Sequence, residues 1–154
     1  VPEQPLVSDP GGVTGEILRD HELTGSVGDG PIVGAAVRVR ASDGTDLGSM
    51  TSDQNAGYNV TVRTKGKHYP LSIDARGGTD LVTGLVPDFV LNSVALEPGK
   101  KTVANLNPFT TLAAELAAEL PGGVTKENLA IALNRVTTEL NSVLFGLMAV
   151  LSFL

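Results

Sequence analysis

The sequence predicts a mainly β protein with some α: an antiparallel β-sandwich followed by a C-terminal helical hairpin. Two observations lead to this fold class. Up to residue 106, short alternating apolar and polar segments recur between turns rich in Gly, Pro, Asp and Asn, which is typical of a sandwich. From residue 107, apolar residues recur at helical spacing. A doubly wound fold is disfavoured because no helical pattern precedes residue 107.

The same change of pattern divides the chain into three segments. Residues 1–12 contain three prolines and two glycines with little periodicity, so we expect an extended arm or linker. Residues 13–106 form the predicted sandwich, and residues 107–154 form the helical segment. Val1 is not a natural start, which indicates a mature or excised fragment.

The clearest strands are expected at 35–41, 58–63 and 69–76, where side chains alternate strictly between an apolar and a polar face. The last two are joined by the short link 64–67, and we predict that they pair as an antiparallel hairpin. Weaker strand patterns occur at 13–18, 23–27, 47–51, 79–85, 89–96 and 103–106, with a polar break at 19–21. The predicted core residues are Val37, Val39, Tyr58, Val60, Val62, Leu71 and Ile73.

Two helices are expected after the sandwich, with Asn107 and Thr125 as their N-caps and Pro108 in the first helical position of the first. Gly and Pro at 121–123 separate them. Glu115 and Glu119 share a polar face and should be exposed. The leucines and valine predicted to be buried are Leu112, Leu116, Leu133, Val136 and Leu140.

Composition excludes several classes of function. Seventeen acidic against eleven basic residues give a net charge of −6, which argues against nucleic-acid binding. The absence of cysteine excludes disulfides and thiolate sites, and the only histidines, His21 and His68, are too few for a three-histidine zinc site. No G-x-S-x-G motif supports a hydrolase. We therefore expect no catalytic residues, and the apolar run 143–154 is too short to span a membrane as a helix.

Calcium is the one metal for which the turns offer ligands. Asp43, Asp46, Asp53 and Asn55 could supply oxygen atoms, although none of these turns has the spacing of a calcium-binding loop. Asp and Asn also favour turns for backbone reasons alone. We expect no cofactor, and calcium at these positions is the weaker alternative. Asn59 begins a glycosylation sequon inside a predicted strand.

The turn residues resemble those of a known family. Residues 25–27, the run from Asp29 to Val39, Thr51-Ser52-Asp53 and Gly57-Tyr58 are similar to the carboxypeptidase regulatory-like domain, which has a transthyretin-like (prealbumin-like) sandwich of the immunoglobulin type. The resemblance covers about residues 23–76, and Gln54-Asn55-Ala56 lengthens one turn relative to the family pattern. Residues 105–112 resemble a segment that follows such domains in large bacterial surface and secreted proteins.

The resemblance implies a non-catalytic structural or adhesive module of an extracellular or cell-surface bacterial protein. Its expected partners are other copies of itself or neighbouring domains of a longer chain. The arm 1–12 or the apolar tail 143–154 would make the contacts of a multimer or filament. The alternative is a sugar- or peptide-binding accessory module of a secreted enzyme, which the absence of Trp weakens. An independent enzyme ranks last.

Overall fold

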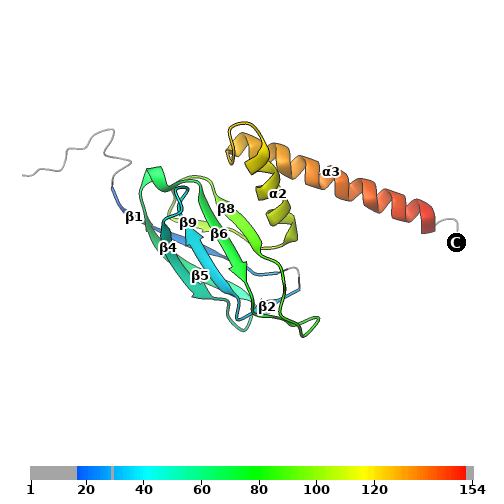
Figure 1. Cartoon of the computed structure of the whole chain (residues 1–154), viewed down its shortest axis with the longest axis horizontal. Helices are drawn as coiled ribbons and strands as arrows, with labels where there is room; N and C mark the ends of the chain where they lie inside the picture. Colours follow the sequence, from blue (N-terminus) through cyan, green and yellow to red (C-terminus); the bar gives the residue numbers. More distant parts are fainter. Residues whose placement is uncertain (1–16, 29, 152–154) are drawn as a thin grey trace, which may run out of the picture. The chain divides into compact units, whose positions relative to one another are not determined.

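The computed structural model describes residues 17–28 and 30–151, with side chains described as far as residue 143 (Figure 1). It separates into two compact units, Val1–Thr111 and Leu112–Leu154. The second unit begins five residues beyond the start of the predicted helical segment. The predicted arm 1–12 and the last three residues of the apolar tail lie outside the described residues.

The first unit is a sandwich of two sheets, which confirms the predicted fold class. One sheet has the order β5-β1-β9, with β1 antiparallel to β5 and parallel to β9. The other has the order β4-β3-β6-β8 and is antiparallel throughout. A short pair, β2-β7, accompanies them. The strands are β1 (Arg19–Ser26), β2 (Ile32–Val33), β3 (Ala36–Arg40), β4 (Asp46–Thr51), β5 (Gly57–Thr64), β6 (Leu71–Arg76), β7 (Thr79–Asp80), β8 (Leu91–Ala95) and β9 (Lys101–Val103).

The core of the sandwich comes from the alternate, inward-facing residues of these strands. The predicted core residues are buried, except Val60, which is half-buried and packs at the edge of the same cluster. Leu23, Val27 and Leu106 are further members of this core. Because each fully buried Val, Leu or Ile contributes roughly 1.5–3 kcal/mol by transfer from water, this cluster dominates the stability of the sandwich.

The predicted hairpin between residues 58–63 and 69–76 is wrong. β5 pairs with β1, whereas β6 pairs with β3 and β8, so the two strands belong to different sheets. Alternation shows which face of a strand is buried but not which strand lies beside it. The link contains a 3-10 helix, Gly66–His68, in which the backbone N–H of Lys65 donates to the His68 ring at 3.0 Å. This folded link carries the chain from one sheet to the other.

Two further strand predictions need correction. The polar residues 19–21 begin β1 instead of breaking it, because His21 faces inward and finds hydrogen-bond partners there. The predicted strand 79–85 ends at Asp80, because the N–H of Gly84 donates to the Asp80 carbonyl at 2.7 Å and closes a turn. Ile17 and Leu18, the described part of the predicted strand 13–18, are not in a strand.

The remaining strand predictions hold with small changes of boundary. The patterns at 23–27, 47–51 and 89–96 correspond to β1, β4 and β8. The exception is the predicted strand 103–106, because β9 spans Lys101–Val103 and shares only Val103 with it. Leu106 makes a separate parallel bridge to Val27.

The helical unit contains most of α2 (Pro108–Glu119) and all of α3 (Lys126–Leu151). Both predicted caps are confirmed. The Asn107 side chain accepts from the N–H of Thr110 at 2.9 Å, and the Thr125 hydroxyl accepts from the N–H of Asn128 at 3.0 Å. No helix within the described residues is long and apolar enough to cross a membrane.

The packing of the helical unit differs from the prediction. Its buried cluster consists of small residues, Ala113, Ala117 and Ala132, with Leu116 and Leu129 packed against it. Because alanine lets two helices approach closely, larger side chains are displaced to the sides of the interface. Burial is confirmed for Val136, Leu116 is half-buried, and the exposure of Glu115 and Glu119 is confirmed. Burial is wrong for Leu112, Leu133 and Leu140, which are 51%, 37% and 47% exposed.

Candidate functional site

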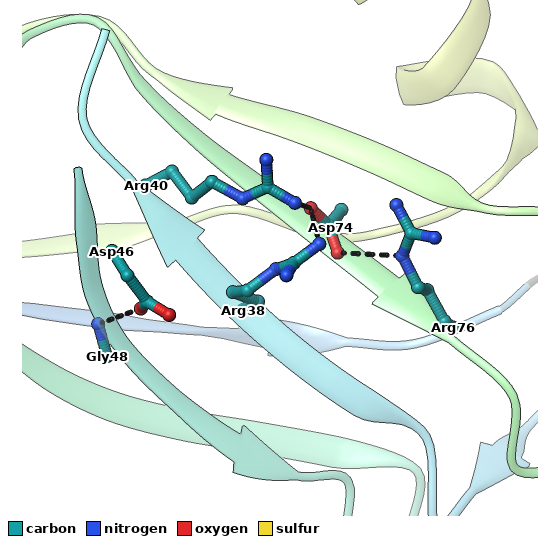
Figure 2. Close-up of polar contacts among 6 residues, drawn as sticks. All are labelled: Arg38, Arg40, Asp46, Gly48, Asp74 and Arg76. Atoms are coloured by element: carbon teal, nitrogen blue, oxygen red, sulfur yellow. Dashed lines mark hydrogen bonds and ion pairs between the residues drawn. The ribbon is translucent and has the colours of Figure 1, made fainter. Parts of the chain in front are cut away.

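Three arginines surround one carboxylate on the outer face of the four-stranded sheet (Figure 2). Arg38 and Arg40 lie two residues apart on β3, and therefore on one face. Asp74 on β6 lies directly opposite Arg38, and Arg76 follows Asp74 on the same face. The four side chains form what we call the arginine cluster.

The distances within the arginine cluster are those of ion pairs without hydrogen bonds. A terminal nitrogen of Arg38 and one of Arg40 each lie 3.7 Å from Asp74 Oδ2, and Arg76 Nε lies 3.6 Å from Oδ1. The Asp74 side chain is only 9% exposed, and its Oδ1 has no hydrogen-bond partner. Three guanidinium groups therefore compensate one buried carboxylate mainly through their charge.

The arginine cluster leaves positive charge and hydrogen-bond donors in excess. Three cations against one anion give a local charge of +2 in a chain whose net charge is −6. Each guanidinium has five N–H donors. Within the described part of the chain, none of the three donates a hydrogen bond to a protein acceptor. Their side chains are 36%, 36% and 56% exposed for Arg38, Arg40 and Arg76, so these donors are accessible from solvent.

A half-open cavity of about 570 Å³ lies at one end of the sandwich. Tyr69 and Thr64 contribute to its wall, and Pro98 and Gly99 come from the turn before β9. Arg19, Asp20, Lys65 and Lys100 contribute charged groups of both signs, and Ile17 and Gly66 complete the lining.

Behind this cavity, His21 is fully buried and both of its ring nitrogens are engaged. Nδ1 lies 2.6 Å from the Tyr69 hydroxyl and Nε2 lies 2.7 Å from the Thr102 hydroxyl. The Tyr69 hydroxyl also lies 2.7 Å from the Thr64 hydroxyl. Burial lowers the pKa of His21 and raises that of Tyr69, so both groups stay neutral near pH 7. Because neither ring nitrogen is available to a ligand, this histidine acts as a structural residue.

The structure separates the predicted calcium ligands. Asp43 precedes β4 and Asp46 is its first residue, whereas Asp53 and Asn55 lie after it, so the strand separates the two pairs. Asp43 accepts the backbone N–H of Thr45 at 2.9 Å. Asp46 likewise accepts the backbone N–H of Gly48 at 3.1 Å, as Figure 2 shows. The hydrogen bonds from the hydroxyl and N–H of Thr45 lower the pKa of Asp43.

Asp53 has a similar role in its own turn. Its Oδ1 accepts the N–H groups of Asn55 at 2.8 Å and Gly57 at 2.9 Å. No three His, Asp or Glu side chains gather at metal-binding distance within the described ranges. Calcium binding at any one of these turns stays a prediction. The hydrogen bonds that these carboxylates accept stabilise the turns themselves.

The sequence reasoning missed the arginine cluster, although the signal was present. Alternation placed Arg38 and Arg40 on the polar face of one strand, and Asp74 and Arg76 on the polar face of another. What was missing was the pairing of these two strands, because residues 69–76 had been paired with residues 58–63. Correct pairing of β3 with β6 brings Arg38 opposite Asp74 and creates the cluster.

An apolar groove of about 200 Å³ lies on the helical unit. Leu112 and Leu116 of α2 line it, together with Val136, Leu140 and Val143 of α3, and Glu139 is the one charged residue. Val143 is 67% exposed. The groove therefore presents the large apolar residues that the alanine interface leaves uncovered.

Comparisons with known proteins place the chain in no family. No family model matches the sequence, and no curated protein matches it. The resemblance to the carboxypeptidase regulatory-like domain therefore stays a prediction.

Among solved structures, the chain is similar to a double mutant of the shaft pilin SpaA from Lactobacillus rhamnosus GG. The sequence identity is 14% and the TM-score is 0.36. The match covers 58% of this chain and 48%, or about half, of the pilin chain. At this level the likeness does not bear on function.

Proposed function

We propose that this chain is a non-catalytic structural or adhesive module of an extracellular bacterial protein, and that copies of it associate through the helical unit. The observation on which this rests is the length of α3. It has 26 residues, whereas its partner α2 has 12. At 1.5 Å per residue, α3 is roughly 20 Å longer than α2, so α2 is too short to cover α3 along its full length.

The C-terminal part of α3, residues 140–151, has the composition of an interface. It contains no charged residue, and Leu140 and Val143 at its start are half to two-thirds exposed. Leaving such side chains in water forgoes roughly 1.5–3 kcal/mol for each one that a partner could bury. A second copy is the occupant that we favour, because the same apolar segment on two copies is self-complementary. Two such segments crossing antiparallel bury each other around a two-fold axis.

The state of the buried histidine supports a non-catalytic role. A general acid or base needs a nitrogen within hydrogen-bond reach of a substrate. Both nitrogens of His21 are held by hydroxyl groups, and it contacts no carboxylate that could activate it. The polar groups behind the cavity at one end of the sandwich therefore stabilise the framework of the sandwich.

The second candidate function is a sugar- or peptide-binding accessory module. The cavity of about 570 Å³ favours it, because its volume suits a small ligand and Tyr69 offers an aromatic surface. Tyr69→Ala should abolish binding of such a ligand, but it also removes two buried hydrogen bonds. Lys100→Ala, on the exposed rim, is the gentler test of ligand binding in this cavity.

Sedimentation analysis of two matched variants tests self-association. Leu140→Glu places a charge in the groove, whereas Ile131→Glu places one on the opposite side of α3 at nearly equal exposure, 47% against 44%. We expect Leu140→Glu to shift the protein to monomer and Ile131→Glu to leave its association unchanged. Equal behaviour of the two variants, or a wild-type chain that is monomeric throughout, would refute association through this groove.

A further inference from the structure

We propose that copies of this chain also associate head to tail, with the loop between β7 and β8 of one copy entering the cavity at the opposite end of the next sandwich. The contact involves only the sandwich unit, so it can fail or succeed independently of the association through the helical unit. In this assembly the cavity holds a segment of a second copy in place of a sugar or a free peptide.

The loop between β7 and β8, residues 81–90, exposes large apolar side chains. Four of them are 56–75% exposed, those of Leu81, Val82, Leu85 and Val86. Backbone hydrogen bonds hold the loop in a tight turn, because the N–H of Asp80 donates to the Leu85 carbonyl at 2.9 Å and the N–H of Gly84 donates to the Asp80 carbonyl at 2.7 Å. The loop is therefore preorganised to present these side chains, and such an apolar patch is typical of a contact surface.

The charge of this loop is negative. Asp80 and Asp88 bracket the four exposed apolar residues, and no Lys or Arg occurs between Arg76 and Lys100. Anionic lipid headgroups would be repelled, which disfavours a membrane surface as the partner. Two such loops from two copies would repel each other in the same way, so a symmetric contact between loops is also disfavoured. The favoured partner is an apolar surface that carries positive charge.

The cavity of about 570 Å³ has both properties. Ile17, Tyr69 and Pro98 contribute apolar surface to its wall. Its charged lining consists of three cationic residues and one anionic residue, namely Arg19, Lys65, Lys100 and Asp20. The anionic residue already pairs with Arg63 at 3.4 Å. The cavity therefore has an excess of positive charge that is complementary to the two carboxylates of the loop.

The loop and the cavity lie at opposite ends of the sandwich. Arg19 and Asp20, the first residues of β1, line the cavity. Beyond the other end of β1, the N–H of Leu81 in the loop donates to the Pro31 carbonyl at 2.9 Å. Figure 1 likewise shows the start of β1 and strand β2, which pairs with β7, at opposite ends.

The length of β1, eight residues, separates these two ends by roughly 26 Å at 3.3 Å per residue. The loop of one copy therefore does not reach its own cavity. Contact between two different surfaces at opposite ends is heterologous, and it repeats from one copy to the next.

This contact is small. Four apolar side chains of one turn bury much less than the roughly 800 Å² per partner of a stable interface. We therefore expect association that is weak in dilute solution, where Leu140→Glu is monomeric, and that is best detected by trapping the contact covalently.

Disulfide formation between two single-cysteine variants tests the contact. Leu85→Cys places a thiol in the loop and Pro98→Cys places one in the cavity, and no native cysteine competes. Both variants also carry Leu140→Glu, so that the helical units do not contribute. Under mild oxidation, we expect an equimolar mixture to form the heterodimer at least about tenfold faster than either variant alone forms a homodimer. One chain with both cysteines should form a ladder of covalent multimers.

Two matched controls make the test specific. Val103→Cys replaces Leu85→Cys at nearly equal exposure, 66% against 68%, and should cross-link slowly with Pro98→Cys. Lys100→Glu in the Pro98→Cys chain should slow heterodimer formation about tenfold, whereas Lys126→Glu, which changes net charge equally at an exposed site of the helical unit, should not. Reaction of each thiol with a small neutral disulfide corrects for its intrinsic reactivity.

Three results would overturn the proposal. The first is a heterodimer that forms no faster with Leu85→Cys than with Val103→Cys. The second is a Leu85→Cys homodimer that forms as fast as the heterodimer, which would indicate contact between two loops. The third is binding of the chain to phosphatidylcholine vesicles that Leu85→Glu abolishes, which would assign the loop to a membrane surface.

Discussion

Acidification should destabilise the sandwich through His21. This residue is fully buried between two hydroxyl groups, and burial lowers its pKa. In the unfolded chain its pKa returns to about 6.5. Between these two values the unfolded chain binds more protons than the folded one, so the free energy of unfolding falls as the pH is lowered.

The size of this effect follows from proton linkage. At pH 5.5, one unit below the unfolded value, the loss is up to about 1.4 kcal/mol, reached when His21 stays neutral in the folded state. At roughly 4–8 °C per kcal/mol for a domain of this size, the melting temperature should fall between pH 7.5 and pH 5.5, by at most about 10 °C.

Chemical or thermal unfolding at pH 7.5, 6.5 and 5.5 measures this dependence. His21→Gln should be less stable at pH 7.5, but its stability should change much less between the three values. His68→Gln, which removes the only other histidine, should keep the wild-type dependence. If wild type and His21→Gln lose stability in parallel, the assignment of the pH dependence to His21 is wrong.

Three further predictions concern the sandwich. Ile73→Asp buries a charge at a fully buried position and should abolish cooperative unfolding by circular dichroism; a wild-type melt would contradict the assigned β6 face. Tyr58→Phe removes a buried hydroxyl that donates to the Ala104 carbonyl at 2.6 Å and should cost about 1–2 kcal/mol in urea unfolding, whereas an unchanged midpoint would show this bond to be unimportant. Gly78→Ala should lower the free energy of unfolding by at least about 1 kcal/mol in the same assay. Gly78 has φ +79°, and an added Cβ would lie 2.6 Å from the Val33 carbonyl oxygen. An unaffected variant would contradict that geometry.

The parts of the fold that the sequence could predict are those set by local chemistry. Alternation identified the buried faces of β3, β5 and β6, because side-chain direction in a strand depends only on position. The helix starts at Asn107 and Thr125 were found because capping acts over three residues. Both kinds of signal are contained in the segment that they describe.

The parts that failed depend on residues distant in the sequence. Nothing in residues 58–76 reveals that β5 pairs with β1 and β6 with β3, and this error concealed the arginine cluster. His21 looked like part of a polar break because its partners, Tyr69 and Thr102, lie 48 and 81 residues away. In the helical unit, leucine periodicity predicted a core of large side chains. The buried cluster instead consists of Ala113, Ala117 and Ala132, where the two helices approach each other closely.

Cross-linking through a single introduced cysteine tests the proposed self-association most directly. The chain contains no cysteine, so any disulfide formed by Val143→Cys must join two copies. Val143 lies in the exposed stretch of α3, close to where two antiparallel segments would cross. Under mild oxidation we expect a covalent dimer of twice the 15.9 kDa chain mass with Val143→Cys and little with Ile131→Cys. Monomer alone, or equal dimer from both variants, would contradict association through the helical unit.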